Sequence, residues 1–185
     1  MEIRLASPIL QGDSIVDGEG IRAVLWTQGC NHKCPGCQNP QTHSFEDGIL
    51  TPIEEIKAQI DELEGHDGIT MSGGDPLYQV EECLEIAKYV KSKGMNVWCY
   101  TGFTYESLMV LSKNNSKIKE FLKTIDVLVD GPFVLEKKSL DCIFRGSTNQ
   151  RIIDTKKSIK ENKVCLVEKY YEDKNVKTKR GRMYV

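Results

Sequence analysis

The sequence lacks any long apolar run. No uninterrupted apolar stretch approaches the roughly 20 residues that span a bilayer, and residues 1–8 contain no long apolar core. We therefore expect neither a membrane-spanning segment nor a secretory signal, and we expect the protein to be cytoplasmic.

The chain also lacks an excess of charge of one sign. It carries 25 Lys and Arg residues against 27 Asp and Glu residues, which gives a net charge of −2. Without an overall basic field, nucleic acid is not expected to be a partner. The stretch 174–182 is locally basic, and we interpret it as a solvated tail without a catalytic role.

Regularly paired cysteines are missing as well. The seven cysteines are an odd number without repeating intervals, and 185 residues are enough to bury one core without disulfides. This composition fits a reducing compartment, where thiols bind metals. We predict a single domain over residues 1–185, with a core at about 17–154 and a C-terminal extension at 155–185.

Three of the cysteines are concentrated in one loop. Cys30, Cys34 and Cys37 are spaced C-x3-C-x2-C. An iron–sulfur cube usually takes four thiolates, one per iron, so three thiolates would leave one iron open to a substrate. A zinc ion completed by His32 or His43 is the alternative, although we expect His32 to face water. The loop alone does not separate the two kinds of site.

Strand-like and helix-like apolar patterns alternate along the chain. The sequence predicts strands at 3–5, 21–28, 68–72, 95–100, 125–129 and 163–168. It predicts helices at 51–63, with Thr51 as N-cap, at 79–92, and in pieces over 104–122 with a break near 114–115. This alternation is typical of an α/β fold with a mostly parallel sheet. A complete eight-fold barrel needs about 250 residues, so we expect a partial, open (β/α) TIM-like barrel.

The chemically distinctive stretches follow the predicted strands. The cysteine loop comes after 21–28, Ser72-Gly73-Gly74-Asp75 after 68–71, Thr101-Gly102 after 95–100, and Asp130-Gly131 after 125–129. Parallel β/α folds bind ligands at the carboxyl ends of their strands. We therefore expect one end of the sheet to collect the site.

Several motifs resemble those of a known family. The cysteine loop followed by Ser72-Gly73-Gly74-Asp75-Pro76 resembles the radical S-adenosylmethionine (SAM) enzymes. Four further stretches resemble the activating proteins of anaerobic ribonucleoside-triphosphate reductase: DGEGIR at 17–22, CPGC at 34–37, DGPF at 130–133 and RGSTNQR at 145–151. The resemblance covers about 17–154 and implies a barrel of the radical SAM type.

The resemblance also implies an activity. Cys30, Cys34 and Cys37 would bind one [4Fe–4S] cluster, and SAM bound at its open iron would be cleaved reductively. The resulting radical would remove a hydrogen atom from a glycine of the reductase, with a flavodoxin-type protein as electron donor. The alternatives are an activase of another glycyl-radical enzyme, such as pyruvate formate-lyase, and a non-enzymatic zinc-binding module.

Further positions are expected to bind the cofactor. Gly73 and Gly74 permit close backbone approach, whereas Asp75, which replaces the Glu common in the superfamily, is not expected to touch SAM directly. Thr101 and Asp130 are candidates for contacts to polar parts of SAM, with ordinary turn capping as the alternative.

The remaining cofactor positions flank the cysteines or lie late in the chain. Gly36 stands where many superfamily loops carry an aromatic residue, so the backbone around Gly36, Cys37 and Gln38 is expected to contact the adenine instead. Arg145 is a candidate partner for a carboxylate.

Overall fold

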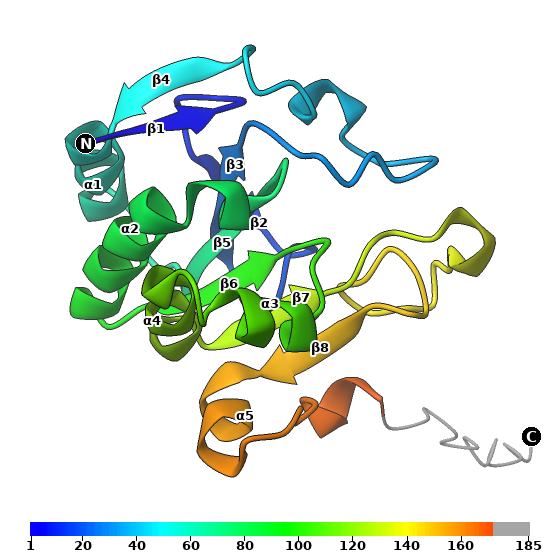
Figure 1. The fold of residues 1–185 in the computed structure, drawn as a ribbon. Coiled ribbons are helices and arrows are strands. Elements are labelled where there is room, and N and C mark those ends of the chain that lie inside the picture. Colours follow the sequence, from blue (N-terminus) through cyan, green and yellow to red (C-terminus); the bar gives the residue numbers. More distant parts are fainter. Residues whose placement is uncertain (172–185) are drawn as a thin grey trace, which may run out of the picture.

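The computed structural model describes residues 1–171 and contains an open eight-stranded sheet (Figure 1). The strands are β1 (Glu2–Leu5), β2 (Gln11–Ser14), β3 (Arg22–Thr27), β4 (Ile49–Pro52), β5 (Gly68–Gly73), β6 (Asn96–Tyr100), β7 (Val127–Asp130) and β8 (Arg151–Asp154). The α-helices are α1 (Ile53–Asp61), α2 (Val80–Ser92), α3 (Tyr105–Leu111), α4 (Ser116–Thr124) and α5 (Thr155–Glu161).

The central strands confirm the predicted parallel sheet. The strand order is β4-β1-β3-β5-β6-β7-β8, with β2 also paired to β3. Strands β3, β5, β6 and β7 run parallel, while β1, β2, β4 and β8 add antiparallel pairs at the two sides. The sheet is open, as expected. Strands β2, β4 and β8 were not predicted, because QGDS of β2 has no apolar residue, the end of ILTP in β4 resembles a helix start, and RIID of β8 has only two apolar residues.

The start of the first helix differs from the prediction. Thr51 is not its N-cap, because Thr51 pairs with Ile3 in the sheet and α1 begins at Ile53 with Pro52 before it. The predicted apolar stripe is confirmed, since Ile53, Ile56 and Ile60 are buried.

Two later predictions have different outcomes. The helical break is confirmed, since α3 ends at Leu111 and Asn115 caps α4 by accepting a hydrogen bond from the Lys117 amide. Instead of a strand at 163–168, the structure has an isolated bridge between Leu166 and Ile153 of β8. The bridge is flanked by two hydrogen bonds to β8, because the Val167 amide donates to the Ile152 carbonyl and the Cys165 carbonyl accepts from the Asp154 amide, both at 2.9 Å. The basic stretch 174–182 lies outside the described residues.

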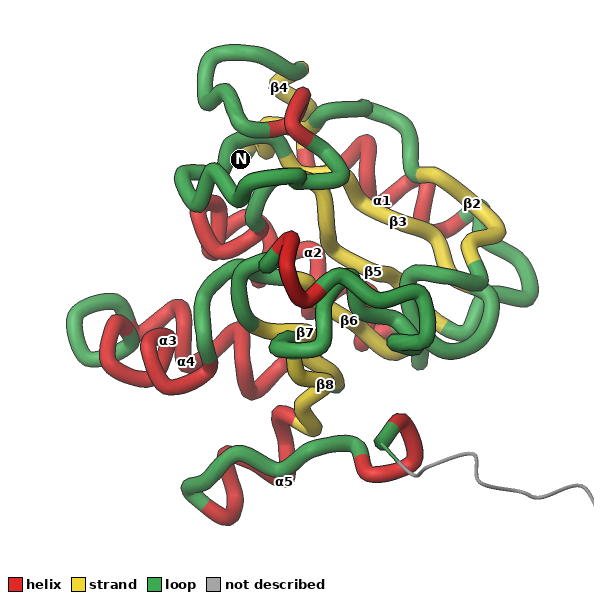
Figure 2. The backbone as a smooth tube through the Cα atoms, turned by 90° about the vertical axis from the view of Figure 1, so that its right-hand side faces the viewer, coloured by secondary structure: helices red, strands yellow, loops and turns green. Residues whose placement is uncertain are grey.

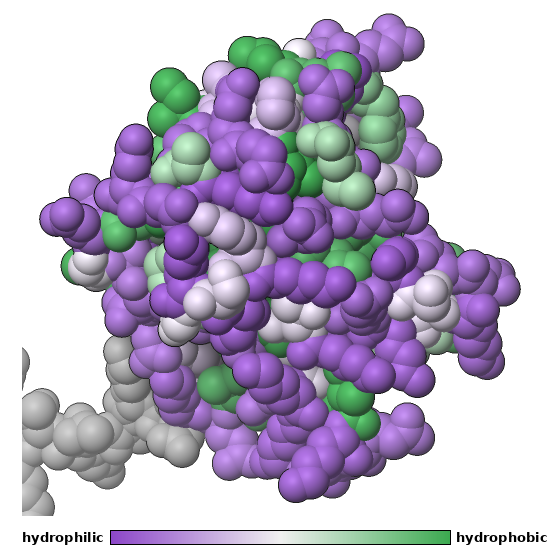
Figure 3. All heavy atoms as spheres, turned by 90° about the vertical axis from the view of Figure 1, so that its left-hand side faces the viewer, coloured by the Kyte–Doolittle hydropathy of each residue, from purple (hydrophilic) through white to green (hydrophobic). Residues whose placement is uncertain are grey.

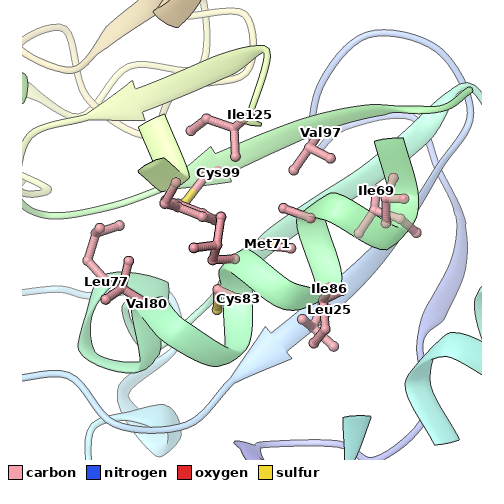
Figure 4. Close-up of a cluster of buried hydrophobic side chains, with 14 of the residues drawn as sticks. Leu25, Ile69, Met71, Leu77, Val80, Cys83, Ile86, Val97, Cys99 and Ile125 are labelled. Carbon is pink, nitrogen blue, oxygen red and sulfur yellow. The ribbon is translucent and has the colours of Figure 1, made fainter. Parts of the chain in front are cut away.

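The main core lies between one face of the sheet and the helices. Met71 of β5, Cys99 of β6 and Cys83 of α2 are fully buried there (Figure 4). Burial raises the pKa of both thiols. The side on which α1, α2 and α4 lie is mostly hydrophilic outside (Figure 3). None of the helices within residues 1–171 has the length and apolar character that crossing a bilayer requires.

The opposite face of the sheet has a different composition. Trp98 belongs to a small cluster there, beside the fully buried Arg22, whose guanidinium donates to Thr70 and to the Ile69 carbonyl. Within residues 1–171, the side chains that pack on this face include Phe144, Val167 and Tyr170.

Candidate functional site

The site is built from loops that follow the parallel strands. Residues 28–48 follow β3 and residues 131–150 follow β7, and both segments project beyond the same end of the sheet (Figures 1 and 2). This is the end where parallel β/α folds bind ligands. The structure therefore places the cysteine loop where the sequence predicted.

A small cavity, here called the cysteine cavity, brings the predicted cluster ligands together. It has a volume of about 120 Å³. Its lining includes Cys30, Cys34, Cys37, Gly73, Gly74 and Thr101. Six of the predicted site residues, from three strand ends, therefore face one space.

Each of the three sulfurs lies near a backbone amide. The Asn39 amide donates to Cys37 Sγ at 3.4 Å. Burial raises the pKa of the Cys30 and Cys34 thiols, and nearby amides, from His32 at Cys30 and from Phe133 at Cys34, oppose that shift. Backbone N–H groups stabilise thiolates and tune the potential of a cluster bound to them.

The three thiols line one cavity without converging on one point. Within residues 1–171 no three or more His, Cys, Asp or Glu side chains are gathered closely enough to hold a metal ion. A cube takes one thiolate per iron, so its ligands surround it rather than converge on one point. Three thiols that line a shared cavity, each near a backbone amide, are arranged as ligands around such a cube would be.

The glycine pair is required by close backbone packing. Gly73 has φ +103°, and a Cβ on it would lie 2.5 Å from the Thr27 carbonyl oxygen. A Cβ on Gly74 would lie 2.4 Å from the Gly29 carbonyl oxygen. Both glycines thus allow the end of β5 to approach the base of the cysteine loop, and they line the cavity.

Asp75 and His32 form a contact that the sequence did not reveal. His32 Nε2 lies 2.7 Å from Asp75 Oδ2, and their side chains are 18% and 1% exposed. The expectation that His32 faces water is therefore wrong, because the carboxylate draws its ring inward. The ring is also packed edge-on against Phe103, with centroids 4.6 Å apart.

Two predicted cofactor contacts are engaged with protein groups. The Thr101 hydroxyl donates to the Asp75 carboxylate at 2.8 Å, although Thr101 still lines the cysteine cavity. Asp130 is 1% exposed and accepts hydrogen bonds from Arg151 and from the Tyr105 amide. The Asp130 carboxylate is thus turned into the protein.

Two further hollows adjoin the cysteine cavity. A connecting hollow of about 230 Å³ shares Cys37 and Tyr100 with it, and an outer groove of about 520 Å³ shares Gln38 and Tyr100 with the connecting hollow. Arg145 lines only the outer groove, where its guanidinium lies 4.5 Å from the Tyr171 ring centroid. The three adjoining hollows, here called the path, lie between the cysteines and the surface.

Gly36 lies apart from these hollows. It has φ +72°, and a Cβ there would lie 2.9 Å from Leu135 Cδ1. Gly36 therefore serves the turn between the second and third cysteines rather than lining the path.

Four residues that lie in the predicted motifs, but were not individually predicted to bind the cofactor, line both the cysteine cavity and the connecting hollow. They are Ser72, Tyr100, Phe133 and Gln150. Ser72 and Tyr100 are the last or nearly last residues of predicted strands and lie on the face away from the helical core, which is a signal that could have identified them.

Comparisons with known proteins agree with this geometry. The family profile described as "4Fe-4S single cluster domain" matches residues 16–153. Proteins named anaerobic ribonucleoside-triphosphate reductase-activating protein are similar over most of the chain. The one from Haemophilus influenzae is 34% identical, covering 75% of this chain and 90% of that protein. The one from Escherichia coli K12 is 33% identical, covering 74% and 90%.

The corresponding protein of Enterobacteria phage T4 is 36% identical, covering 74% of this chain and 86% of its own. Among solved structures, QueE from Escherichia coli gives a TM-score of 0.44 at 15% identity, covering 56% of this chain and 54% of that one.

Proposed function

This chain belongs to the family of anaerobic ribonucleoside-triphosphate reductase-activating proteins, and we propose that it is a radical SAM enzyme that generates a glycyl radical on that reductase. The observation that carries the proposal is the shared cavity of Cys30, Cys34 and Cys37, with an amide near each sulfur. The fold assignment that goes with it is a partial (β/α) barrel, supported by four parallel strands with helices over one face.

The cofactors we propose are one [4Fe–4S] cluster and SAM. Cys30, Cys34 and Cys37 would hold the cluster, which leaves one iron for the amino and carboxylate groups of methionine. When bound and reduced, the cluster supplies one electron that splits SAM into methionine and a 5′-deoxyadenosyl radical, which takes a hydrogen atom from the target glycine. A flavodoxin-type protein is the proposed electron donor.

The chain's own residues bind and shield these groups. Gly73 and Gly74 keep the end of β5 against the loop and offer their main chain to the SAM amino group. Ser72, Tyr100 and Gln38 line the connecting hollow, where the adenosyl part would extend away from the cluster. The outer groove would admit the target segment of the reductase.

Anaerobic reconstitution with iron, sulfide and SAM tests the cofactors. We expect a brown protein that binds about four irons per chain and cleaves SAM under reducing conditions. Cys34→Ala should abolish cleavage, because it removes one of three cluster ligands. Cys165→Ala is the matched control, since Cys165 lies outside the cavity. Unimpaired cleavage by Cys34→Ala would mean that the ligands are misassigned.

The target is tested separately. Mixing the reconstituted protein, SAM and reductant with the anaerobic reductase should give the electron-spin resonance signal of a glycyl radical. A signal with pyruvate formate-lyase alone would transfer the assignment to that enzyme. One zinc per chain, no iron and a colourless solution would support a zinc module instead.

A further inference from the structure

The Asp75 carboxylate connects three segments of the site. It is fully buried and accepts hydrogen bonds from the Leu77 amide at 3.0 Å, the Gly102 amide at 3.0 Å and the Thr101 hydroxyl at 2.8 Å. His32 Nε2 is a fourth neighbour at 2.7 Å. One carboxylate thus joins the ends of β5 and β6 to the middle of the cysteine loop.

The His32 side of this contact is enclosed. His32 lies midway between Cys30 and Cys34 in the sequence, and its ring contacts Phe103. A Cβ on Gly102 would lie 2.4 Å from His32 Cδ2, so the ring occupies space that only a glycine leaves free. Contacts with Phe103 and Gly102 therefore define the position of the His32 ring.

The part of the cysteine loop between Cys30 and Cys34 has few other contacts. Asn31, Lys33, Pro35 and Gly36 are exposed. The base of the loop is tied down, because the Asp75 amide donates to the Gly29 carbonyl at 2.9 Å and the Cys30 amide to the His43 carbonyl at 3.0 Å. Between that base and Cys34, the contact of His32 with Asp75 is the side-chain attachment to the sheet.

The length of the aspartate side chain matters for this contact. The Asp75 carboxylate accepts a hydrogen bond from the amide two residues on, which begins the short helix Pro76–Gln79. A side chain longer by one methylene would push the carboxylate toward the His32 ring, which is already 2.7 Å away. Aspartate is therefore the acidic residue that fits between the two segments.

We propose that Asp75 is a positioning residue that holds the cysteine loop in place through His32, without touching SAM. The role of the loop as cluster ligand rests on the proposed function, but the contact itself does not. Groups that orient metal ligands typically contribute 10–100-fold to metal affinity. Loss of this contact should therefore loosen the cluster without removing any ligand.

Three variants isolate the contact. His32→Phe keeps a ring against Phe103 but removes the hydrogen bond, and Asp75→Asn removes the charge. His32→Gln is the conservative rescue, because its amide nitrogen can still reach the carboxylate. His66→Phe is the matched control, since His66 faces Asp13 at 3.4 Å outside all three hollows.

The first measurement uses the metal-free protein. In His32→Phe, hydrogen exchange at the Cys37 amide, which donates to the Cys34 carbonyl at 3.1 Å, should be about tenfold faster, with exchange in the main core unchanged. His32→Gln should restore much of the protection. Wild-type exchange in His32→Phe would overturn the proposal, even if Asp75→Asn failed to fold.

The second measurement uses the reconstituted protein. Iron release to a chelator should be about 10–100-fold faster in His32→Phe and in Asp75→Asn, and no faster in the double variant than in the singles. The spin-resonance spectrum of the reduced cluster with SAM should also change. Multiplying effects in the double variant would mean that the residues act independently, against the proposal. Failure of the wild type to take up iron would overturn the proposed function, while the exchange measurement would still decide the contact.

Discussion

Replacing Asp130 by asparagine distinguishes a structural anchor from a cofactor contact. The Asp130 side chain is 1% exposed. Its carboxylate accepts hydrogen bonds from Arg151 Nε at 2.9 Å and Nη2 at 2.5 Å, and from the Tyr105 amide at 2.7 Å. These contacts connect the end of β7 to β8 and to the start of α3. Loss of the charge should therefore destabilise the metal-free protein.

The expected magnitude follows from the surroundings of Arg151. Removing one partner of a buried ion pair typically costs about 3 to 5 kcal/mol. Arg151 is 30% exposed, however, and it also donates to Glu106 at 3.0 and 2.7 Å, so its charge keeps a partner. We expect about 2 kcal/mol for Asp130→Asn. Asp130→Ala also leaves the Tyr105 amide unpaired, which adds about 1 to 2 kcal/mol.

Urea unfolding of the metal-free protein measures this difference. Asp130→Asn should lower the midpoint without changing the slope, because the surface exposed on unfolding stays the same. Glu106→Gln is the matched control, since Glu106 contacts the same arginine but is 60% exposed, and it should cost no more than about 1 kcal/mol.

One result would refute the anchor role of Asp130. If Asp130→Asn unfolds at the wild-type urea concentration but no longer binds SAM, the carboxylate contacts the cofactor and the anchor role is wrong. SAM binding should instead survive in the fraction of Asp130→Asn that remains folded.

Two further predictions concern close packing and pH. Gly74→Ala places a Cβ 2.4 Å from the Gly29 carbonyl oxygen, so in urea unfolding it should destabilise the protein by about 1 to 3 kcal/mol. Gly12→Ala is the control, because the nearest atom to a Cβ there is 4.0 Å away. Equal urea midpoints for the two variants would contradict the close packing at Gly74. Burial tends to raise the pKa of Asp126, but hydrogen bonds from two lysines and a backbone amide outweigh it and hold that pKa below its usual 3.8. The Asp126 carboxylate should therefore stabilise the protein by about 1 to 2 kcal/mol above pH 4, and this stabilisation should be lost as the pH falls through the pKa of Asp126 in the folded protein. The free energies of unfolding of Asp126→Asn and the wild type should differ at pH 7 and converge in acid. A difference that stays constant across pH would contradict the assignment.

The elements of the fold that could be predicted are those with a local signal. The apolar runs of β3, β5 and β6 and the stripe along α2 fall where the sequence placed them, because side chains at fixed intervals must share a face. Strands β2, β4 and β8 escaped prediction because their pairing depends on neighbours elsewhere in the chain. Thr51 shows the conflict directly, since a good capping residue was taken up by β4.

The sequence by itself determined which loop carries the thiols and which strand ends surround it, since Cys30, Cys34 and Cys37 lie close in the chain and Gly73-Gly74 follows a strand. Only the tertiary structure decided that His32 reaches Asp75, 43 residues away, and that Asp130 turns to Arg151, 21 residues away. Spacing within a loop constrains which atoms can meet, whereas a hydrogen bond between distant segments depends on how the whole sheet brings them together.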